Sequence, residues 1–376
     1  MKTLKIYVVF LVLAIGLLAW VPQRAYSGAR RDSSTRSAGT ETRVVTDMWG
    51  REVRIPVKVE KIIALGPGAP RVAAYLDVMD MFIGAEEYDI QDFSVLRDYN
   101  PVHHDALRAL PMVGMGGGSG DNNAFPEEII MLAPDVILAT FSREAADELQ
   151  AQTGIPVVSI WLTTGLANET FYTGMRLFAD VVGAQERCER VLSFVDASIA
   201  DLNRRTSGIP DSGKLKAYTG AVTWNGRRGL AGTYSNFGPF QAINALNVAR
   251  EASVDGFYEV DLERLIVWDP DVIFLDPGNM DLVNDEYATN PNYFRALRAI
   301  REGRVYTMPS FNFAGTNITY ALMNAYFAGT ILFPEQFADV NIVAKSAEIL
   351  TMFLGKNTYD TMAAGGLYYG TITIGR

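Results

Sequence analysis

The sequence predicts an α/β fold of two Rossmann-like lobes, each with a central, mostly parallel sheet, joined by a long rigid α-helix with a ligand cleft between the lobes. Short apolar runs alternate with amphipathic segments in both halves of the 376 residues, which is typical of parallel sheets covered by helices. A similar segment also occurs twice, as PEEIIMLAPDVIL at 126–138 and as LERLIVWDPDVIF at 262–274. Between the copies, residues 184–207 have apolar side chains at helical spacing and no neighbouring strand.

The N-terminus has the pattern of an export signal. Lys2 and Lys5 precede an apolar run over 6–21, and Ala25-Tyr26-Ser27 offers a small-x-small cleavage site. We expect a signal peptide at 1–27, with a retained membrane anchor as the alternative, and a periplasmic or extracytoplasmic location. Residues 28–43 are rich in Ser, Thr, Arg and Gly and are expected to form a flexible leader.

The N-terminal α/β lobe is expected to span 44–167. Its strands are predicted at 62–65, 81–89, 112–115, 135–140 and 155–161, and its helices start at Pro70, at Pro126 and near Asp147. A helical bridge follows over 168–208. It contains one helix from Asn168 to Gly183 and a second from Ala184 to Ser207.

The C-terminal α/β lobe is expected at 209–340, where the alternation resumes. Strands are predicted at 215–224, 271–278 and 304–310, and helices at 261–270, 290–303 and 318–334. The tail at 341–376 is predicted to be helical up to about Leu354.

Composition excludes several classes of function. The net charge is −10 and the pI is near 4.9, so no basic face for nucleic acid is expected. The single cysteine, Cys188, excludes an intrachain disulfide or a cysteine zinc site. The run GMGGGSGD lacks both the GxxxxGK[ST] and the GxGxxG spacing, and no catalytic constellation can be placed. We therefore expect that the protein is not an enzyme.

The chain resembles the substrate-binding proteins of ABC importers for iron–siderophore complexes, haem and cobalamin. The segments that carry the resemblance include the doubled phrase, DMWGREVRIPVKVEKIIALGPGAPR, YSNFGPFQAINALNVA and REGRVYTMP. The resemblance implies a monomer that delivers its cargo to an ABC permease dimer with a cytoplasmic ATPase. It implies no intrinsic cofactor, and a cargo that is an iron chelate, haem or a corrinoid.

The resemblance also implies that Glu127 and Glu263 dock onto the two permease subunits. Both glutamates fall in the first turn of a predicted helix, where a carboxylate is stabilised by the helix dipole whether or not it has a partner. Glu128 is the competing residue in the first lobe.

Ligands of open α/β sheets bind beyond the carboxyl ends of the strands. The loops expected there combine aromatic and basic side chains, which suits a bulky, partly aromatic, anionic metal chelate. The candidate ligand-binding residues are Arg71, Tyr88, Trp161, Trp224, Arg227, Arg228, Tyr234, Phe237 and Phe313.

His103 and His104 are weak candidates for metal or haem-iron ligands. They are adjacent in a segment expected to be a loop, and adjacent side chains usually point apart, so an exposed loop without a ligand is the alternative.

Two other functional classes also remain open. One is a two-lobed enzyme such as a metal chelatase or nucleotide-sugar transferase, and the other is a sensor domain that presents ligand to a membrane receptor.

Overall fold

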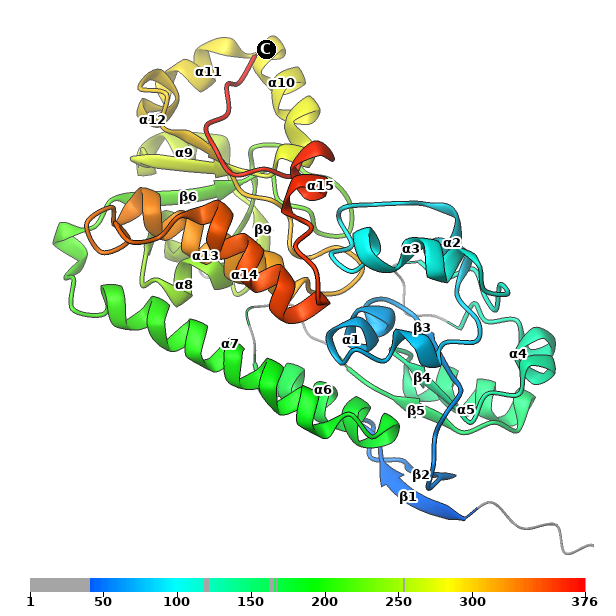
Figure 1. Cartoon of the computed structure of the whole chain (residues 1–376). Coiled ribbons are helices and arrows are strands. Elements are labelled where there is room, and N and C mark those ends of the chain that lie inside the picture. Colours follow the sequence, from blue (N-terminus) through cyan, green and yellow to red (C-terminus); the bar gives the residue numbers. More distant parts are fainter. Residues whose placement is uncertain (1–40, 118–121, 162–165, 167, 253, 376) are drawn as a thin grey trace, which may run out of the picture. The chain divides into compact units, whose positions relative to one another are not determined.

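The structure is a computed structural model that describes residues 41–117, 122–161, 166, 168–252 and 254–375. The expected signal peptide, most of the expected leader and the end of the glycine run lie outside the described residues. Among the described residues, no helix is both long enough and apolar enough to cross a membrane. The predicted fold class is confirmed, since two separate parallel sheets form the centres of two lobes (Figure 1).

The first lobe is built on three parallel strands in the order β3-β4-β5. These are β3 (Ile62–Leu65), β4 (Val136–Ala139) and β5 (Val157–Ser159). Helices α1 (Ala69–Tyr75), α2 (Glu87–Gln91), α3 (Asn100–Arg108), α4 (Pro126–Leu132) and α5 (Arg143–Thr153) accompany them, with a 3₁₀ turn η1 (Met79–Met81). A separate antiparallel hairpin consists of β1 (Thr42–Thr46) and β2 (Glu52–Pro56).

The second lobe is built on four parallel strands in the order β11-β10-β6-β8. These are β6 (Lys216–Gly220), β8 (Leu246–Asn247), β10 (Val272–Leu275) and β11 (Val305–Thr307). The antiparallel pair is β7 (Gly232–Tyr234) and β9 (Phe257–Glu259). The helices are α8 (Gly238–Ala242), α9 (Leu262–Trp268), α10 (Met280–Thr289), α11 (Pro291–Ala296) and α12 (Arg298–Arg301), with 3₁₀ turns η2 (Asp211–Gly213), η3 (Val248–Glu251) and η4 (Pro277–Asn279).

Five further helices join the lobes. They are α6 (Glu169–Val182), α7 (Gln185–Thr206), α13 (Ile318–Leu332), α14 (Ile342–Leu354) and α15 (Tyr359–Ala364). The expected caps of α6 are confirmed, because the Asn168 side chain accepts from the N–H of Phe171 and Gly183 has φ 78°. Helix α7 contains 22 residues and so extends for about 33 Å. Figure 1 shows α6 and α7 running alongside each other.

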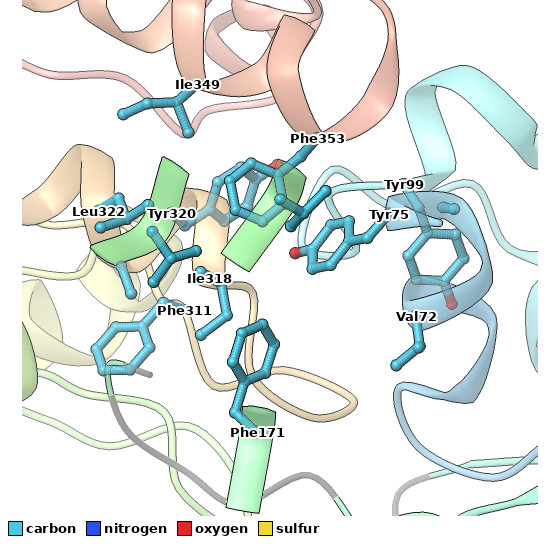
Figure 2. Packing of buried hydrophobic residues seen from close by; sticks show 14 of the residues in the cluster. Val72, Tyr75, Tyr99, Phe171, Phe311, Ile318, Tyr320, Leu322, Ile349 and Phe353 are labelled. Atoms are coloured by element: carbon cyan, nitrogen blue, oxygen red, sulfur yellow. The ribbon is translucent and has the colours of Figure 1, made fainter. Parts of the chain in front are cut away.

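One continuous hydrophobic core connects the first lobe to α13 and α14. Tyr75 of α1 packs edge-to-face on Phe353 of α14, with 4.7 Å between the ring centroids. Figure 2 shows these two rings near Tyr320 of α13. The described residues accordingly pack as one compact unit. The tail beyond residue 340 is therefore part of the fold, since it contacts both lobes.

Three expectations about the secondary structure were wrong. The segments 81–89 and 112–115 are not strands but make isolated bridges, Ile62 to Phe82 and Ala85 to Met112. Pairing stops there because α2 begins at Glu87 and Pro111 has no N–H to donate. The helix expected at 290–303 is divided at Leu297, which is buried in an extended conformation. The leader expected to reach residue 43 ends earlier, because strand β1 includes Thr42 and Arg43.

The structure explains the aspartate in the repeated phrase. Asp135 accepts a hydrogen bond from the N–H of Lys61, and Asp271 accepts one from the N–H of Lys216. In each lobe the aspartate side chain thus holds the start of the neighbouring parallel strand by a hydrogen bond. Both helices that precede these aspartates end in a left-handed residue, Ala133 or Asp269. The Pro-Asp-Val-Ile half of the repeat is therefore structural in both lobes.

Candidate functional site

Two neighbouring cavities lie beyond the carboxyl ends of the strands of the second sheet. The larger, which we call the aromatic compartment, has a volume of about 540 Å³. The smaller, the arginine compartment, has a volume of about 340 Å³. Both are lined by Trp224 and Asn312, so they meet at these two side chains.

The strands position these linings. Strand β6 ends at Gly220 and leads to Trp224, and β11 ends at Thr307 and leads to Asn312. The first lobe contributes Leu166 to the aromatic compartment and Tyr88 to the arginine compartment. Asn168, the N-cap of α6, also lines the aromatic compartment. The cavities are thus formed by both lobes, although most of their lining comes from the second.

The walls of the aromatic compartment are a packed cluster of rings. Trp224 stacks on Phe257, with 6.2 Å between centroids, and Tyr234 lies edge-on to Phe257 at 5.9 Å. Phe237 and Phe311 continue the cluster at 5.6 Å from each other. Trp224 and Phe257 are half-buried, so part of each ring remains available to a ligand. Burial raises the pKa of the Tyr234 phenol to about 12, which keeps it neutral.

The arginines near the cavities already have acidic partners. Arg227 pairs with Asp281 and donates to Asn279 Oδ1 at 2.9 Å. Arg228 pairs with Glu259 at 3.3 Å and lies 5.4 Å from the centre of the Phe257 ring. A charged ligand would have to compete with these carboxylates for either guanidinium.

A buried carboxyl group in each lobe has a raised pKa. Burial raises the pKa of Asp276 to about 6, although the N–H of Gly278 and the hydroxyl of Thr223 oppose that shift. Asp276 follows β10 and lines a small cavity of about 20 Å³ with Tyr234 and Phe237. In the first lobe, burial and the nearby Asp89 raise the pKa of Glu86 to about 8.

The structure brings six of the nine predicted ligand residues to the cavities. Tyr88, Trp224, Arg227 and Phe313 line the arginine compartment, and Trp224, Tyr234 and Phe237 line the aromatic one. The other three lie elsewhere. Arg228 is behind Trp224, donating to its carbonyl oxygen, and Trp161 is 42% exposed against Trp49, with 5.4 Å between ring centroids.

Arg71 is only 1% exposed and forms an ion pair of 2.8 Å with the fully buried Asp98, so its guanidinium faces protein rather than a cavity. The prediction that Arg71 contacts the ligand is therefore wrong, because its guanidinium is buried and paired with Asp98. Sequence reasoning also missed Phe257. The adjacent aromatic residues Phe257 and Tyr258 in GFYEV were the signal that could have found it.

The expectation that His103 and His104 lie in a loop was wrong. Both are half-buried in helix α3, which begins at Asn100 and has Pro101 as its second residue. Burial lowers the pKa of His103, and His104 lies edge-on to Phe93, with 5.7 Å between centroids. Across the described part of the chain, no group of three or more His, Cys, Asp or Glu side chains could hold a metal ion.

Glu127 and Glu263 are both exposed in the first turn of their helices, as expected. The Asp261 side chain caps α9 by accepting from the N–H of Glu263 at 2.8 Å. Each glutamate is followed, three and four positions later, by two exposed apolar residues, which share its helix face. These are Ile130 and Met131 in α4, and Ile266 and Val267 in α9.

Comparison with known proteins identifies the family. Residues 90–311 match the family model described as periplasmic binding protein. The chain belongs to this family. Periplasmic binding proteins are solute-binding components of ABC transporters and are not enzymes, so the predicted class of protein is confirmed.

A curated relative of this periplasmic binding protein is the molybdate-binding protein MolA of Haemophilus influenzae. It is 25% identical over 334 residues, which cover 82% of this chain and 90% of MolA. The solved structure of MolA bound to molybdate has a TM-score of 0.63 and 21% identity, covering 84% of this chain and 98% of that one.

Two structures from Veillonella parvula are also similar in fold. A periplasmic solute-binding protein has a TM-score of 0.66 and 21% identity, covering 87% of this chain and 97% of that one. The TroA-like periplasmic binding protein FepB has a TM-score of 0.64 and 18% identity, covering 88% and 99%. Their identities are low, so they show the shared fold and leave the cargo of this chain open.

Proposed function

We propose that this protein is an exported solute-binding protein that captures a metal–organic complex, most simply an iron–siderophore type of chelate, and delivers it to an ABC permease. The aromatic compartment carries this proposal. Its volume of about 540 Å³ and its wall of Trp224, Tyr234 and Phe257 suit a bulky ligand with apolar or aromatic surface. Haem or a corrinoid would use the same walls in the same role.

A bare oxyanion is the second candidate, because the relative MolA binds molybdate. A small dianion is held by converging hydrogen-bond donors, and most strongly by cationic donors whose charge is not already compensated. Here Arg227 and Arg228 are compensated by Asp281 and Glu259. Breaking these pairs would leave carboxylates without partners and would offset much of the gain from binding. The charge distribution therefore favours a large ligand of low net charge over a bare oxyanion.

Isothermal titration of the purified protein with a ferric siderophore, haem, cobalamin and molybdate tests the proposal. We expect at least one metal–organic complex to bind more tightly than molybdate. The Trp224→Ala variant should weaken that binding by about tenfold to a hundredfold, because a buried aromatic contact contributes roughly 1.5–3 kcal/mol.

Trp161→Ala is the matched control for Trp224→Ala, because Trp161 is also a partly exposed tryptophan but lines neither compartment. It should bind like the wild type. Binding of molybdate with no binding of any of the three complexes would contradict the proposed cargo. Turnover of a bound ligand would instead favour the enzymatic alternative.

Delivery is proposed to use Glu127 and Glu263. Two carboxylates at equivalent positions of two lobes, each beside an exposed apolar pair, suit a partner that presents two equivalent subunits. Charge complementarity at such a surface mainly governs orientation and the rate of association. The permease dimer would supply the opposite charges.

The double variant Glu127→Lys/Glu263→Lys should bind cargo normally but reduce cellular uptake of the metal by tenfold or more. Uptake would be measured by metal analysis of cells that depend on this protein. Glu144→Lys/Glu335→Lys changes the net charge equally at two other exposed glutamates and should leave uptake intact. Normal uptake by the first variant would exclude these glutamates as docking residues.

A further inference from the structure

We propose that Arg71 is a positioning residue that sets the shape of the arginine compartment from the opposite lobe. The residue belongs to α1 of the first lobe, but it donates to the carbonyl oxygens of Ala314 at 2.7 Å and of Phe313 at 3.1 Å. Residues 312–315 form one wall of the arginine compartment. The inference rests on the proposed function only in taking this compartment as part of the ligand site.

The guanidinium is itself held in place. Its Nε donates to Asp98 Oδ1 at 2.8 Å. The other oxygen of Asp98 accepts from the hydroxyls of Tyr75 and Thr319, the latter at 2.6 Å. Thr319 lies in the first turn of α13, directly after the wall loop. Asp98 thus connects α1 to the base of α13. Figure 2 shows Tyr75 of α1 and Tyr320 of α13 in the hydrophobic core.

The wall loop has a conformation that needs such support. Ala314 has φ 47° and Gly315 has φ 80°, so two successive residues are left-handed, and the first of them is not glycine. A Cβ on Gly315 would lie 3.1 Å from Arg71 Nη1 and 3.3 Å from the Cα of Gly68. The two lobes therefore touch closely at this loop, and the planar fork of an arginine can donate to both carbonyls at once.

The consequence concerns specificity. The loop fixed by Arg71 places Phe313 and Asn312, and Asn312 also lines the aromatic compartment. A lysine at position 71 would keep the charge beside Asp98 but could not donate to both carbonyls and to the carboxylate in the same geometry. We therefore expect the wall to shift while the fold is kept.

The test uses protein labelled with 5-fluorotryptophan, because Trp224 lines the same compartment as the wall loop. The Trp224 fluorine signal is assigned with Trp224→Phe. In ligand-free Arg71→Lys, that signal should move or broaden, while those of Trp49, Trp161 and Trp268 stay. Arg71→Met/Asp98→Asn, which removes both buried charges together, should have the same effect if Arg71→Lys folds poorly.

Tyr320→Phe is the matched control, since it removes a different buried bond between the lobes, from the Tyr320 hydroxyl to the carbonyl of Val95 at 2.6 Å. It should leave the signals of Trp49, Trp161, Trp224 and Trp268 in place. A lowered melting temperature with an unchanged Trp224 signal in both Arg71 variants would overturn the proposal, because Arg71 would then be only structural.

A binding arm extends the test. For the tightest ligand among the four compounds named above, Arg71→Lys should lose about tenfold in affinity, and Tyr320→Phe should lose none. Unchanged affinity together with a shifted Trp224 signal would also count against a role in specificity. If the wild type binds none of the compounds, the proposed function fails, and the fluorine spectra still decide the role of Arg71.

Discussion

Glu86 makes the stability of the protein depend on pH. This glutamate is 4% exposed and immediately precedes helix α2. Both its carboxylate oxygens accept from the N–H of Gly66, at 3.0 and 3.1 Å, and Asp89 lies nearby. The perturbation is Glu86→Gln, because glutamine has the shape of the protonated acid and stays neutral at every pH.

The sign follows from the two states of the wild type. Burial raises the pKa of Glu86 from its ordinary value of 4.5 to about 8 in the folded protein. Between these values the folded state holds a proton that the unfolded state has released, so stability falls as the pH rises through this window. At about 1.4 kcal/mol for each pH unit, the fall is at most roughly 5 kcal/mol. The free energy of unfolding of Glu86→Gln should not show this fall.

Urea denaturation at pH 5, 7 and 9 measures the effect. The free energy of unfolding of Glu86→Gln, minus that of the wild type, should increase with pH by several kcal/mol. Taking this difference cancels the contribution of a buried acid that does not interact with Glu86, such as Asp276. Glu128→Gln is the exposed control, and its difference from the wild type should be constant. A difference for Glu86→Gln that is the same at all three pH values would refute the reasoning.

Three further predictions concern packing and metal content. A Cβ on Gly329 would lie 2.4 Å from the buried ring of Phe337, so Gly329→Ala should lower the free energy of unfolding by about 1–3 kcal/mol in urea. Phe353→Ala should cost about 3–5 kcal/mol by the same measurement, because it empties the fully buried space beside Tyr75 and separates α14 from α1. Dialysis of the cargo-free protein against EDTA should leave its calorimetric melting temperature unchanged, and a drop would reveal a structural metal.

Local pattern predicted the elements whose stability is mostly local. Helix α6 begins and ends at the caps read from Asn168 and Gly183, and α7 follows its apolar stripe. The strands β4 and β10 appear within the two copies of the repeated phrase, because a short apolar run after a Pro-Asp pair can be buried on both faces of a parallel sheet. Most of the aromatic residues that line the two compartments could also be predicted from the sequence, because ligands of open α/β sheets bind beyond the carboxyl ends of the strands.

Long-range contacts decided what the pattern could not. Nothing near Arg71 in the sequence indicates its partners. Asp98 is 27 positions away, and the carbonyls of residues 313 and 314 are 242 and 243 positions away. The sequence also does not predict the acidic partners of Arg227 and Arg228. In the structure their charges are compensated by Asp281 and Glu259. His103 and His104 fall in a helix, although their neighbours suggest a loop.

The sequence by itself therefore determined the fold class: its repeated helix–strand unit, its helical bridge and its cleft-forming loops follow from periodicity and capping, which act over a few residues. The class of protein came from the resemblance of these segments to a known family. The tertiary structure decided which charges remain available to a ligand. A charge acts through space, so the state of an arginine depends on whichever carboxylate folding brings within a few ångströms. That distinction separates Arg71, whose guanidinium is paired with Asp98, from Trp224 and Phe257, whose half-buried rings line the aromatic compartment where we propose that the cargo binds.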